Sequence, residues 1–462
     1  MNSPLTAILI GAGQRGADSY APYALRHPDQ LRFVAVAEPI PERRQRFAAQ
    51  HHLSAQSIYE SWEPLLAQPK LADAALICTQ DQQHTAPTLA ALKAGYDVLL
   101  EKPMATTLEE CVQLVHASEQ AGRQLHICHV MRYTPHAQKL REVLQSGVLG
   151  EVVNVSHREN VSYWHMAHSY VRGNWANLSR SAPMILAKCC HDFDILTWWL
   201  DRRCERLSST GSLLHFRPEN APPGALPYCL DGCPASESCP YYAPRLYLEL
   251  APLWQSFAES ASGFNRFAVQ THQRYPKLVK AFSPLYPPLR TLSNYRGWPL
   301  TVLAVNPTPE NITEALRHGP YGRCVYHCDN DVVDRQAVLM HFEGGLPVTL
   351  TMQGHSHIEY RTTRIEGTRA TLLAEFGTGG SWIEVRQHRP DRHVRYDTTT
   401  HPEQGHGGGD EALMASFVRS LHGEPGQALT LARQSLESHR MAFAAEQARL
   451  EGRVVKMNEI LS

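Results

Sequence analysis

The chain has 462 residues, 43% of them apolar, with 44 basic and 45 acidic residues and a net charge of −1. This length predicts two or three domains, and the balanced charge gives no reason to expect a nucleic acid or an anionic membrane as a partner. No apolar run reaches the roughly 18 residues of a membrane span and no leader precedes the first predicted strand, so we expect a cytoplasmic protein with unpaired cysteines.

The first predicted element is a short buried strand that runs into a glycine-rich turn. Residues 7–10 are apolar, and Gly11, Gly13 and Gly16 follow in the spacing G-x-G-x-x-G. The first glycine permits a tight turn, the second lets the backbone approach a pyrophosphate, and the third lets the next helix pack close to the strand. The N-terminus of that helix favours phosphate groups. The segment therefore predicts a dinucleotide-binding unit.

The second predicted strand, residues 31–37, ends at Glu38. A carboxylate at this place can hold the two hydroxyls of a ribose and repel a 2′-phosphate, which favours NAD over NADP. Arg43 follows a few residues later and keeps NADP as an alternative.

Strands and helices go on alternating as far as residue 128. We predict strands at residues 74–78, 97–100 and 124–128, with helices at 85–94 and 108–121 between them. This alternation builds a doubly wound parallel sheet of the α/β class, and such sheets bind ligands beyond the carboxyl ends of their strands. The segments after these strands, residues 78–81, 101–103 and 129–133, are therefore candidate binding positions.

The pattern changes after about residue 130. We predict a strand at 151–160, a helix at 183–200 and a hairpin that turns at Gly344 and Gly345, followed by more strands of one antiparallel sheet. An amphipathic helix is predicted at 427–450. Residues 217–320 are rich in Pro, Gly and Tyr with little periodicity, so we expect an irregular insertion there.

Two groups of ionisable residues are candidates for acid–base chemistry. Lys102 follows a strand whose end faces the predicted cofactor, where it could bond a substrate hydroxyl, and the Lys102–Pro103 peptide is a candidate for the cis form. On the helix at 183–200, Lys188, His191 and Asp192 lie beside one another. A surface loop and a solvated helix face are the respective alternatives.

Two further clusters stand out in the second half of the chain. Asn160, His165, Arg172 and Trp175 lie within one short segment, and such side chains bind sugar rings, hydroxyls or an acidic group. The thiols of two loops could hold a structural zinc ion, with buried free thiols as the alternative. The candidate zinc ligands are Cys229, Cys233, Cys239 and Cys328.

The chain resembles the Gfo/Idh/MocA oxidoreductase family. The matching segments are the glycine motif, Glu38, CTQDQQH at 78–84, AALKAGYDVLLEKPMA at 90–105 and His191-x-x-Asp194. The resemblance covers residues 1–160 well and the rest more loosely. It implies a Rossmann domain at 1–130 and an α+β domain at 131–462. The second domain would have a large open, mainly antiparallel sheet, an irregular cysteine-containing insertion at about 217–330, and C-terminal helices that pack back.

The resemblance also implies chemistry: NAD or NADP as cofactor, a sugar, sugar derivative or cyclitol as substrate, and a homodimer or homotetramer. The family's catalytic lysine and histidine carry over to Lys102 and His191. The family's aspartate, four residues before the histidine, falls on Ala187. We therefore expect His191 to be the base and Lys102 to hold the substrate oxygen, with Lys188 or Asp192 tuning the histidine.

Residues are assigned to the two binding functions as follows. The predicted cofactor-binding residues are Gly11, Gly13, Gln14, Arg15, Gly16, Glu38, Arg43, Thr79, Gln80, His84, Glu101 and Lys102. The predicted substrate-binding residues are Arg132, Tyr133, Asn160, His165, Arg172, Trp175 and His191.

Three functions fit this reading. The first, which we favour, is a dehydrogenase that passes a hydride from a sugar or cyclitol hydroxyl to NAD. The second is a redox-neutral glycoside hydrolase, in which retained NAD oxidises the ring, the glycosidic bond is eliminated, water adds and the hydride returns. The third is a non-catalytic sensor that binds NAD(P), against which the presence of Lys102 and His191 argues.

Overall fold

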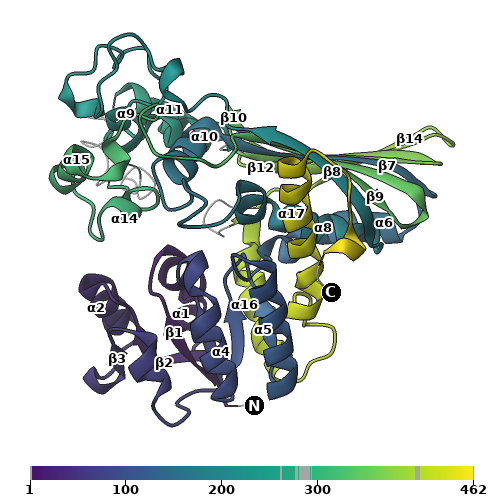
Figure 1. The fold of residues 1–462 in the computed structure, drawn as a ribbon, viewed down its shortest axis with the longest axis horizontal. Helices are drawn as coiled ribbons and strands as arrows, with labels where there is room; N and C mark the ends of the chain where they lie inside the picture. The colour runs from purple at the N-terminus through teal and green to yellow at the C-terminus, as the bar shows by residue number, and fades with distance from the viewer. Residues whose placement is uncertain are drawn as a thin grey trace.

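The computed structural model describes residues 3–260, 263–275, 279, 292, 294–400 and 406–460. Part of the insertion predicted at about 217–330 therefore lies outside the described residues. Figure 1 shows a first sheet with its helices near the N-terminus, a long curved second sheet, and a helical lobe beside the second sheet. No helix in the described ranges is long and apolar enough to cross a bilayer.

In the described residues, the first sheet has six parallel strands in the order β3-β2-β1-β4-β5-β6. The strands are β1 (Leu5–Ile10), β2 (Leu31–Ala37), β3 (Ile58–Tyr59), β4 (Ala74–Ile77), β5 (Asp97–Leu100) and β6 (Leu125–Ile127). All except the very short β3 were predicted. The strand order reverses between β1 and β4, and this switch point opens a ligand crevice at the carboxyl edge.

The helices of this half separate the strands as expected for a doubly wound sheet. They are η1 (Gln14–Tyr20), α1 (Pro22–Arg26), α2 (Pro41–Gln50), α3 (Trp62–Leu66), α4 (Thr85–Lys93) and α5 (Leu108–Ala121). Side chains of β1 are buried on both faces: Ile8 and Ile10 belong to one apolar cluster, and Ala7 and Leu9 to another. A parallel strand covered on both faces reads as a continuous apolar run, which is why the sequence revealed it.

The second sheet has, in the described residues, nine strands in the order β14-β13-β12-β11-β7-β10-β9-β8-β15. Its strands are β7 (Val152–Ser162), β8 (Cys204–Ser212), β9 (Arg335–Phe342), β10 (Leu346–Ser356), β11 (Tyr360–Gly367), β12 (Ala370–Gly377), β13 (Gly380–Gln387), β14 (Arg392–Asp397) and β15 (Val455–Lys456). The pairing is antiparallel except between β7 and β10. The predicted hairpin is confirmed, because β9 and β10 pair across Gly344 and Gly345, both with positive φ.

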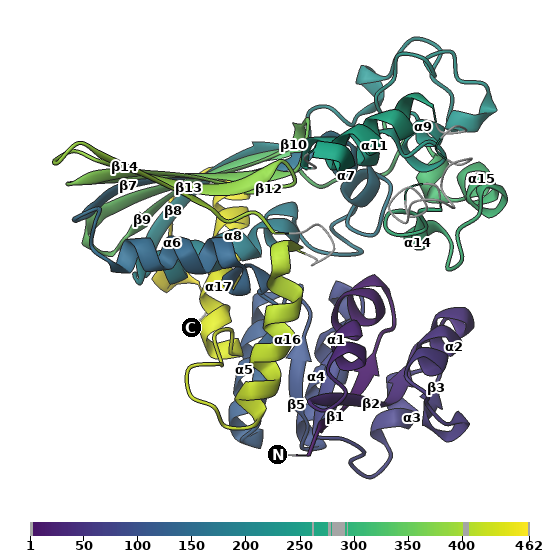
Figure 2. The ribbon, with the colours of Figure 1, turned by 180° about the vertical axis from the view of Figure 1, so that it is seen from behind.

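Helices join the two sheets. Figures 1 and 2 show α6 (Pro135–Gln145), α8 (Met184–Leu200) and α17 (Ala432–Glu451) on one face of the second sheet, while α16 (Gly409–Leu421) lies beside the first sheet. The C-terminal segment also contacts β6 directly, since the N–H of Ile127 donates to the carbonyl of Thr430 over 2.8 Å. The C-terminal helices therefore pack back onto the first sheet.

The segment predicted as an irregular insertion is partly helical in its described residues: residues 217–242 hold only two short 3-10 helices, and longer helices follow. It contains α9 (Ala243–Tyr247), α10 (Ala251–Ser260), α11 (Gly263–Arg274), α14 (Leu300–Leu303) and α15 (Pro309–His318), packed around an apolar cluster that includes Trp254. Proline occupies the first turn of α9 and of α15, where its missing N–H costs nothing. Two of the prolines in this segment therefore mark the start of a helix.

The close packing at the glycine turn leads to a prediction about stability. A Cβ on Gly16 would lie 2.3 Å from the carbonyl oxygen of Gly11, whereas the nearest atom to a Cβ on Gly13 would be Arg43 Nη1, at 3.9 Å. We expect Gly16→Ala to lower the free energy of unfolding by about 1–3 kcal/mol, as overpacking does. Thermal unfolding measures this, with Gly13→Ala as the matched control that keeps its Tm. Equal losses in both variants would contradict the account.

Candidate active site

The glycine turn forms a cradle that fits a dinucleotide. Gly11 has φ +92°, and a Cβ there would lie 2.6 Å from the carbonyl oxygen of Cys78, so only glycine fits. The buried carboxylate of Glu38 accepts the N–H of Ala12 over 2.7 Å and the N–H of Ile40 over 3.0 Å. These bonds fix a negative charge at the end of β2, where a ribose would lie. Residues 11–16 and Glu38 would therefore hold the nucleotide.

Arg15, predicted to bind the cofactor, is instead shared by two carboxylates. Its Nε lies 2.6 Å from Glu101 Oε1, and its Nη2 lies 2.8 Å from Asp410 Oδ1. Burial is the largest effect and opposes ionisation of each acid, but Arg15, with Lys102 and Tyr20 beside Glu101 and His406 beside Asp410, holds the pKa of both acids below their ordinary values. Because Glu101 follows β5 and Asp410 begins α16, Arg15 ties the C-terminal segment to the first sheet.

Other residues predicted to bind the cofactor shape the loops around the cradle. His84 is fully buried, with one ring nitrogen 2.7 Å from the carbonyl oxygen of Pro103 and the other 3.2 Å from that of Thr79. The hydroxyl of Thr79 donates to the carbonyl of Gln83, and the amide of Gln14 donates to Ser19. Gln80 precedes the short helix η3 (Asp81–Gln83).

Lys102 links the first sheet to helix α8. The peptide between Lys102 and Pro103 is cis, as predicted. The ammonium group of Lys102 donates to the carbonyl of Ala187 over 3.0 Å. That carbonyl lies one helical turn before His191 on α8. The lysine at the end of β5 and the histidine of α8 therefore lie in the same part of the molecule.

Helix α8 is buried around almost its whole circumference, so the alternative of a solvated polar face is wrong. His191 is 6% exposed, Asp192 0% and Asp194 1%. A buried ionisable group must find a partner, and the partners of Asp192 lie on the second sheet. Asp192 lies 2.9 Å from His157 Nε2 and 2.7 Å from Arg361 Nε.

Lys188 also makes its ion pairs away from His191. Its ammonium group lies 3.2 Å from Glu159 and also pairs with Glu359. Burial lowers the pKa of Lys188 less than these carboxylates raise it, so the lysine stays charged. The expectation that Lys188 or Asp192 contacts and tunes His191 therefore does not match the hydrogen bonds observed.

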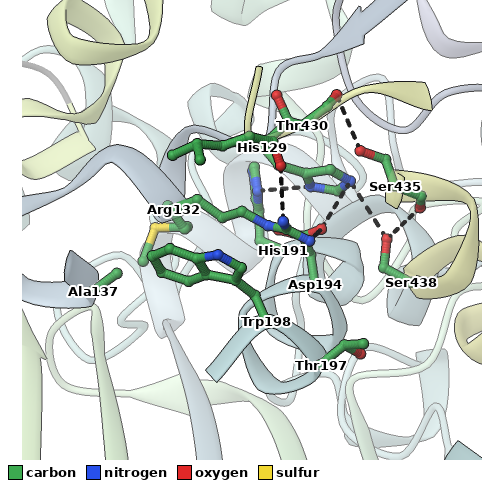
Figure 3. Close-up of polar contacts among 12 residues, drawn as sticks. His129, Arg132, Ala137, His191, Asp194, Thr197, Trp198, Thr430, Ser435 and Ser438 are labelled. Carbon is green, nitrogen blue, oxygen red and sulfur yellow. Dashed lines mark hydrogen bonds and ion pairs between the residues drawn. The ribbon is translucent and has the colours of Figure 1, made fainter. Parts of the chain in front are cut away.

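The hydrogen-bonding neighbour of His191 is His129, directly after β6 (Figure 3). The two Nδ1 atoms lie 3.4 Å apart. Beyond His129, the guanidinium of Arg132 makes two bonds to Asp194, of 2.6 and 2.7 Å. The strand end of the first sheet and the helix of the second sheet thus meet through a buried polar chain.

The imidazoles of His129 and His191 are both held in the neutral form. Burial, followed by the nearby charge of Lys102, lowers the pKa of His191 well below its ordinary value. Burial, followed by the charge of Arg132, does the same to the pKa of His129. A neutral imidazole can accept a proton at pH 7, which is the state that a general base requires.

Several residues predicted to bind substrate already have partners within the protein. Arg132 is committed to Asp194, and the hydroxyl of Tyr133 lies 3.1 Å from that of Thr430. The indole N–H of Trp175 donates to Asp81 over 2.9 Å. The remaining pairs are Asn160 with the carbonyl of Tyr360, and His165 with Glu359.

Arg172 and the cysteines form a separate cluster, and the predicted zinc site needs correction. Arg172 lines a small cavity with Cys229, Cys233, Cys239 and Cys324. Its guanidinium donates to the carbonyl of Tyr241 over 2.8 Å. Yet the described residues hold no group of three or more His, Cys, Asp or Glu that could bind a metal ion. Burial raises the pKa of Cys239, and raises that of Cys328 to about 11, so both remain thiols.

Sequence reasoning missed the residues that surround the predicted pair. His129 stood in a segment noted for following a strand, which was a usable signal. Asp410, Glu359 and Arg361 lie more than 160 positions from Arg15, Lys188 and Asp192, with which they respectively pair, and no local pattern predicts these pairs.

The fold and the glycine cradle define a Rossmann domain of the dinucleotide-binding type joined to an open-sheet domain. Residues 5–129 match the model of the Gfo/Idh/MocA oxidoreductase family, described as an NAD-binding Rossmann fold. The match covers the first sheet and its helices.

Curated relatives include oxidoreductases, and solved structures share the fold. The D-glucoside 3-dehydrogenase of Escherichia coli is 32% identical over 33% of this chain and 42% of its own length. Inositol 2-dehydrogenase 4 of Saccharopolyspora erythraea is 29% identical over 45% of this chain and 57% of its own. The chain thus spans about half the length of these relatives. An Agrobacterium radiobacter oxidoreductase, solved with NAD+, L-tartaric acid and magnesium, shares the fold with TM-score 0.66 and 15% identity, covering 99% of this chain and 100% of that one.

The Arg15 ion pairs predict a pH-dependent contribution to stability. Replacing Asp410 by Asn should lower the free energy of unfolding at pH 7 by about 1–3 kcal/mol, because a charge-assisted bond is lost. The folded pKa of Asp410 lies below its unfolded value of about 4. The difference between wild type and variant should therefore be full above pH 4 and shrink as pH falls below it.

Thermal unfolding at several pH values measures that difference. Asp18→Asn is the matched control, because Asp18 pairs with Arg46 near the surface and should contribute less than about 1 kcal/mol. A difference for Asp410→Asn that disappears above pH 5 would contradict the depressed pKa.

Proposed function

We propose that the protein is an NAD-dependent oxidoreductase that oxidises a hydroxyl of a neutral sugar, sugar derivative or cyclitol. The observation that carries the proposal is that Lys102, at the carboxyl edge of the first sheet, reaches the turn of α8 before a buried, neutral His191. The two sugar- and cyclitol-named relatives support the substrate class.

The residues present suit this reaction. When bound, the nicotinamide accepts a hydride from a carbinol carbon. His191 Nε2 has no hydrogen-bond partner among the described residues, and part of the ring remains accessible. We assign to it the hydroxyl proton. The ammonium group of Lys102 would hold the substrate oxygen and stabilise its developing negative charge.

The surrounding charges favour a neutral substrate. Lys188 is paired with Glu159 and Glu359, and Arg361 with Glu159 and Asp192. Burial raises the pKa of Glu159 to about 7, but the pKa values of Asp192 and Glu359 are lowered by the cations beside them, so these two carboxylates alone balance the two cations and little positive charge is left for an acidic substrate. An acidic group was one of the ligands expected for the cluster that includes Arg172, and the side chain of Arg172 is engaged within the protein.

The choice of NAD over NADP rests on Glu38. Its carboxylate is fixed at the end of β2 by two backbone N–H groups and would repel a 2′-phosphate. Arg43 Nη1 would lie 3.9 Å from a Cβ on Gly13, so this arginine is also near the cradle. NADP remains the weaker ligand in this proposal.

Replacing Lys102 by Met tests the catalytic assignment. We expect kcat to fall by about 10²–10⁴-fold, the size of a missing acid–base or electrostatic group, while Kd for NAD changes by less than about threefold. Turnover of a panel of sugars and cyclitols is followed by NADH absorbance. Lys93→Met, an exposed lysine at the end of α4, is the control. Undiminished turnover in Lys102→Met would overturn the assignment.

The redox-neutral alternative predicts a different state of the purified protein. A dehydrogenase exchanges its cofactor on each turnover, so the purified protein should release well below one nucleotide per chain when denatured. Chromatography of the released nucleotide measures this. Near-stoichiometric NAD, together with cleavage of a glycoside without net NADH, would favour the hydrolase instead.

A further inference from the structure

The histidine of α8 lacks the neighbouring acid expected from the family pattern. Ala187 stands where the aspartate would be, and its carbonyl binds Lys102. Asp192 is committed to His157 and Arg361. The position of the proton on His191 must therefore be set by another group, and the hydrogen bond to His129 identifies it.

Residues of α17 on the far side of His129 fix the direction of these hydrogen bonds (Figure 3). The hydroxyl of Ser438 lies 2.8 Å from the carbonyl oxygen of Ser435, to which it donates. Its oxygen then offers lone pairs to His129 Nε2, 3.4 Å away. The carboxylate of Asp194, an acceptor, lies 4.0 Å from the same nitrogen. Both groups facing His129 Nε2 are acceptors, so that nitrogen carries the proton.

The neighbouring histidine of α17 does not supply a competing proton. His439 Nε2 accepts the N–H of Met104 over 2.8 Å, so its proton lies on Nδ1. That Nδ1 is 2.9 Å from the carbonyl oxygen of Ser435 and donates to it. Backbone groups of fixed polarity thus set the proton positions of His439.

The protonated nitrogen of His191 then follows from that of His129. A neutral imidazole carries one proton, so His129 with its proton on Nε2 has a bare Nδ1. The atom 3.4 Å from it, His191 Nδ1, must therefore be the donor. This leaves the lone pair of His191 on Nε2, the nitrogen without a partner among the described residues.

We propose that His129 is the positioning residue of the site: it holds His191 in the Nδ1–H tautomer, so that Nε2 presents the lone pair that accepts the substrate proton. The catalytic part of this inference rests on the proposed function, whereas the tautomer itself does not. During oxidation the substrate O–H bond breaks and its proton moves to His191 Nε2. The imidazolium that forms keeps its Nδ1–H on His129.

The hydrogen bond also explains why a second buried histidine is present. A carboxylate beside His191 would have been a charged acceptor for Nδ1–H. His129 is instead a neutral acceptor, and burial and the nearby charge of Arg132 keep its pKa low. The carboxylate of Asp194 lies 4.0 Å from His129 Nε2, at the opposite end of the His129 ring from its hydrogen bond with His191.

The tautomer is tested by nuclear magnetic resonance of protein labelled with ¹⁵N-histidine, at pH 7 and without substrate. The resonance of His191 is identified by its loss in His191→Gln. Two-bond correlations distinguish a proton on Nδ1 from one on Nε2, and we expect Nδ1 in the wild type. In His129→Phe, which keeps a ring but removes the acceptor, the Nε2–H form should appear. A wild-type proton on Nε2, or a tautomer unchanged in His129→Phe, would overturn the proposal.

Kinetics test the positioning role with a matched pair of variants. His129→Phe should lower kcat about 10- to 100-fold with KM and the Kd for NAD unchanged. His129→Asn, whose side-chain oxygen can stand near the place of Nδ1, should recover kcat to within a few-fold of wild type. Equal losses in both variants would contradict the role. Should the wild type turn over no polyol while the tautomer is Nδ1–H, the proposed function fails and the tautomer assignment stands.

Discussion

An ionisable group removed from water must be paired, and helix α8 buries His191, Asp192 and Asp194 together. Their partners come from two places: His129 and Arg132 follow β6, and Arg361 lies on β11 of the second sheet. These pairings fix the rotation and depth of the helix. Breaking the ion pair of Asp192 or of Asp194 would leave a buried charge alone, at a cost of several kcal/mol, so the site is part of what holds the two sheets together.

The same requirement accounts for the C-terminal segment. Asp410 at the start of α16 meets Arg15 of the glycine turn, and His439 of α17 accepts the N–H of Met104, two residues after Lys102. The carbonyl of Leu429 accepts from Arg132. Chain positions hundreds of residues apart thus meet at the strand ends where the nucleotide and substrate are proposed to bind.

The parts that the sequence predicted are those with local signals. Continuous apolar runs marked the parallel strands, glycine spacing marked the cradle, and the run before Lys102 marked the end of β5. The helices of the lobe were missed because the Pro, Gly and Tyr content of residues 217–320 was taken to indicate irregular structure, although α15 carries a local signal, with Ile312 and Leu316 on one buried face. The partners of Lys188 and Asp192 were missed because they lie on β7, on β11 and in the loop that precedes β11. An ion pair between segments so far apart in the sequence leaves no local pattern. Arg132 and Arg172 were assigned to substrate from residue type alone, which cannot tell a buried structural guanidinium from an open one.

A crystal structure of the protein with NAD tests the central claim most directly. The account predicts the pyrophosphate against residues 11–16, the ribose on Glu38, and the nicotinamide ring facing a space bordered by Lys102 Nζ and His191 Nε2. A nucleotide bound elsewhere, or a nicotinamide ring pointing away from both residues, would contradict it.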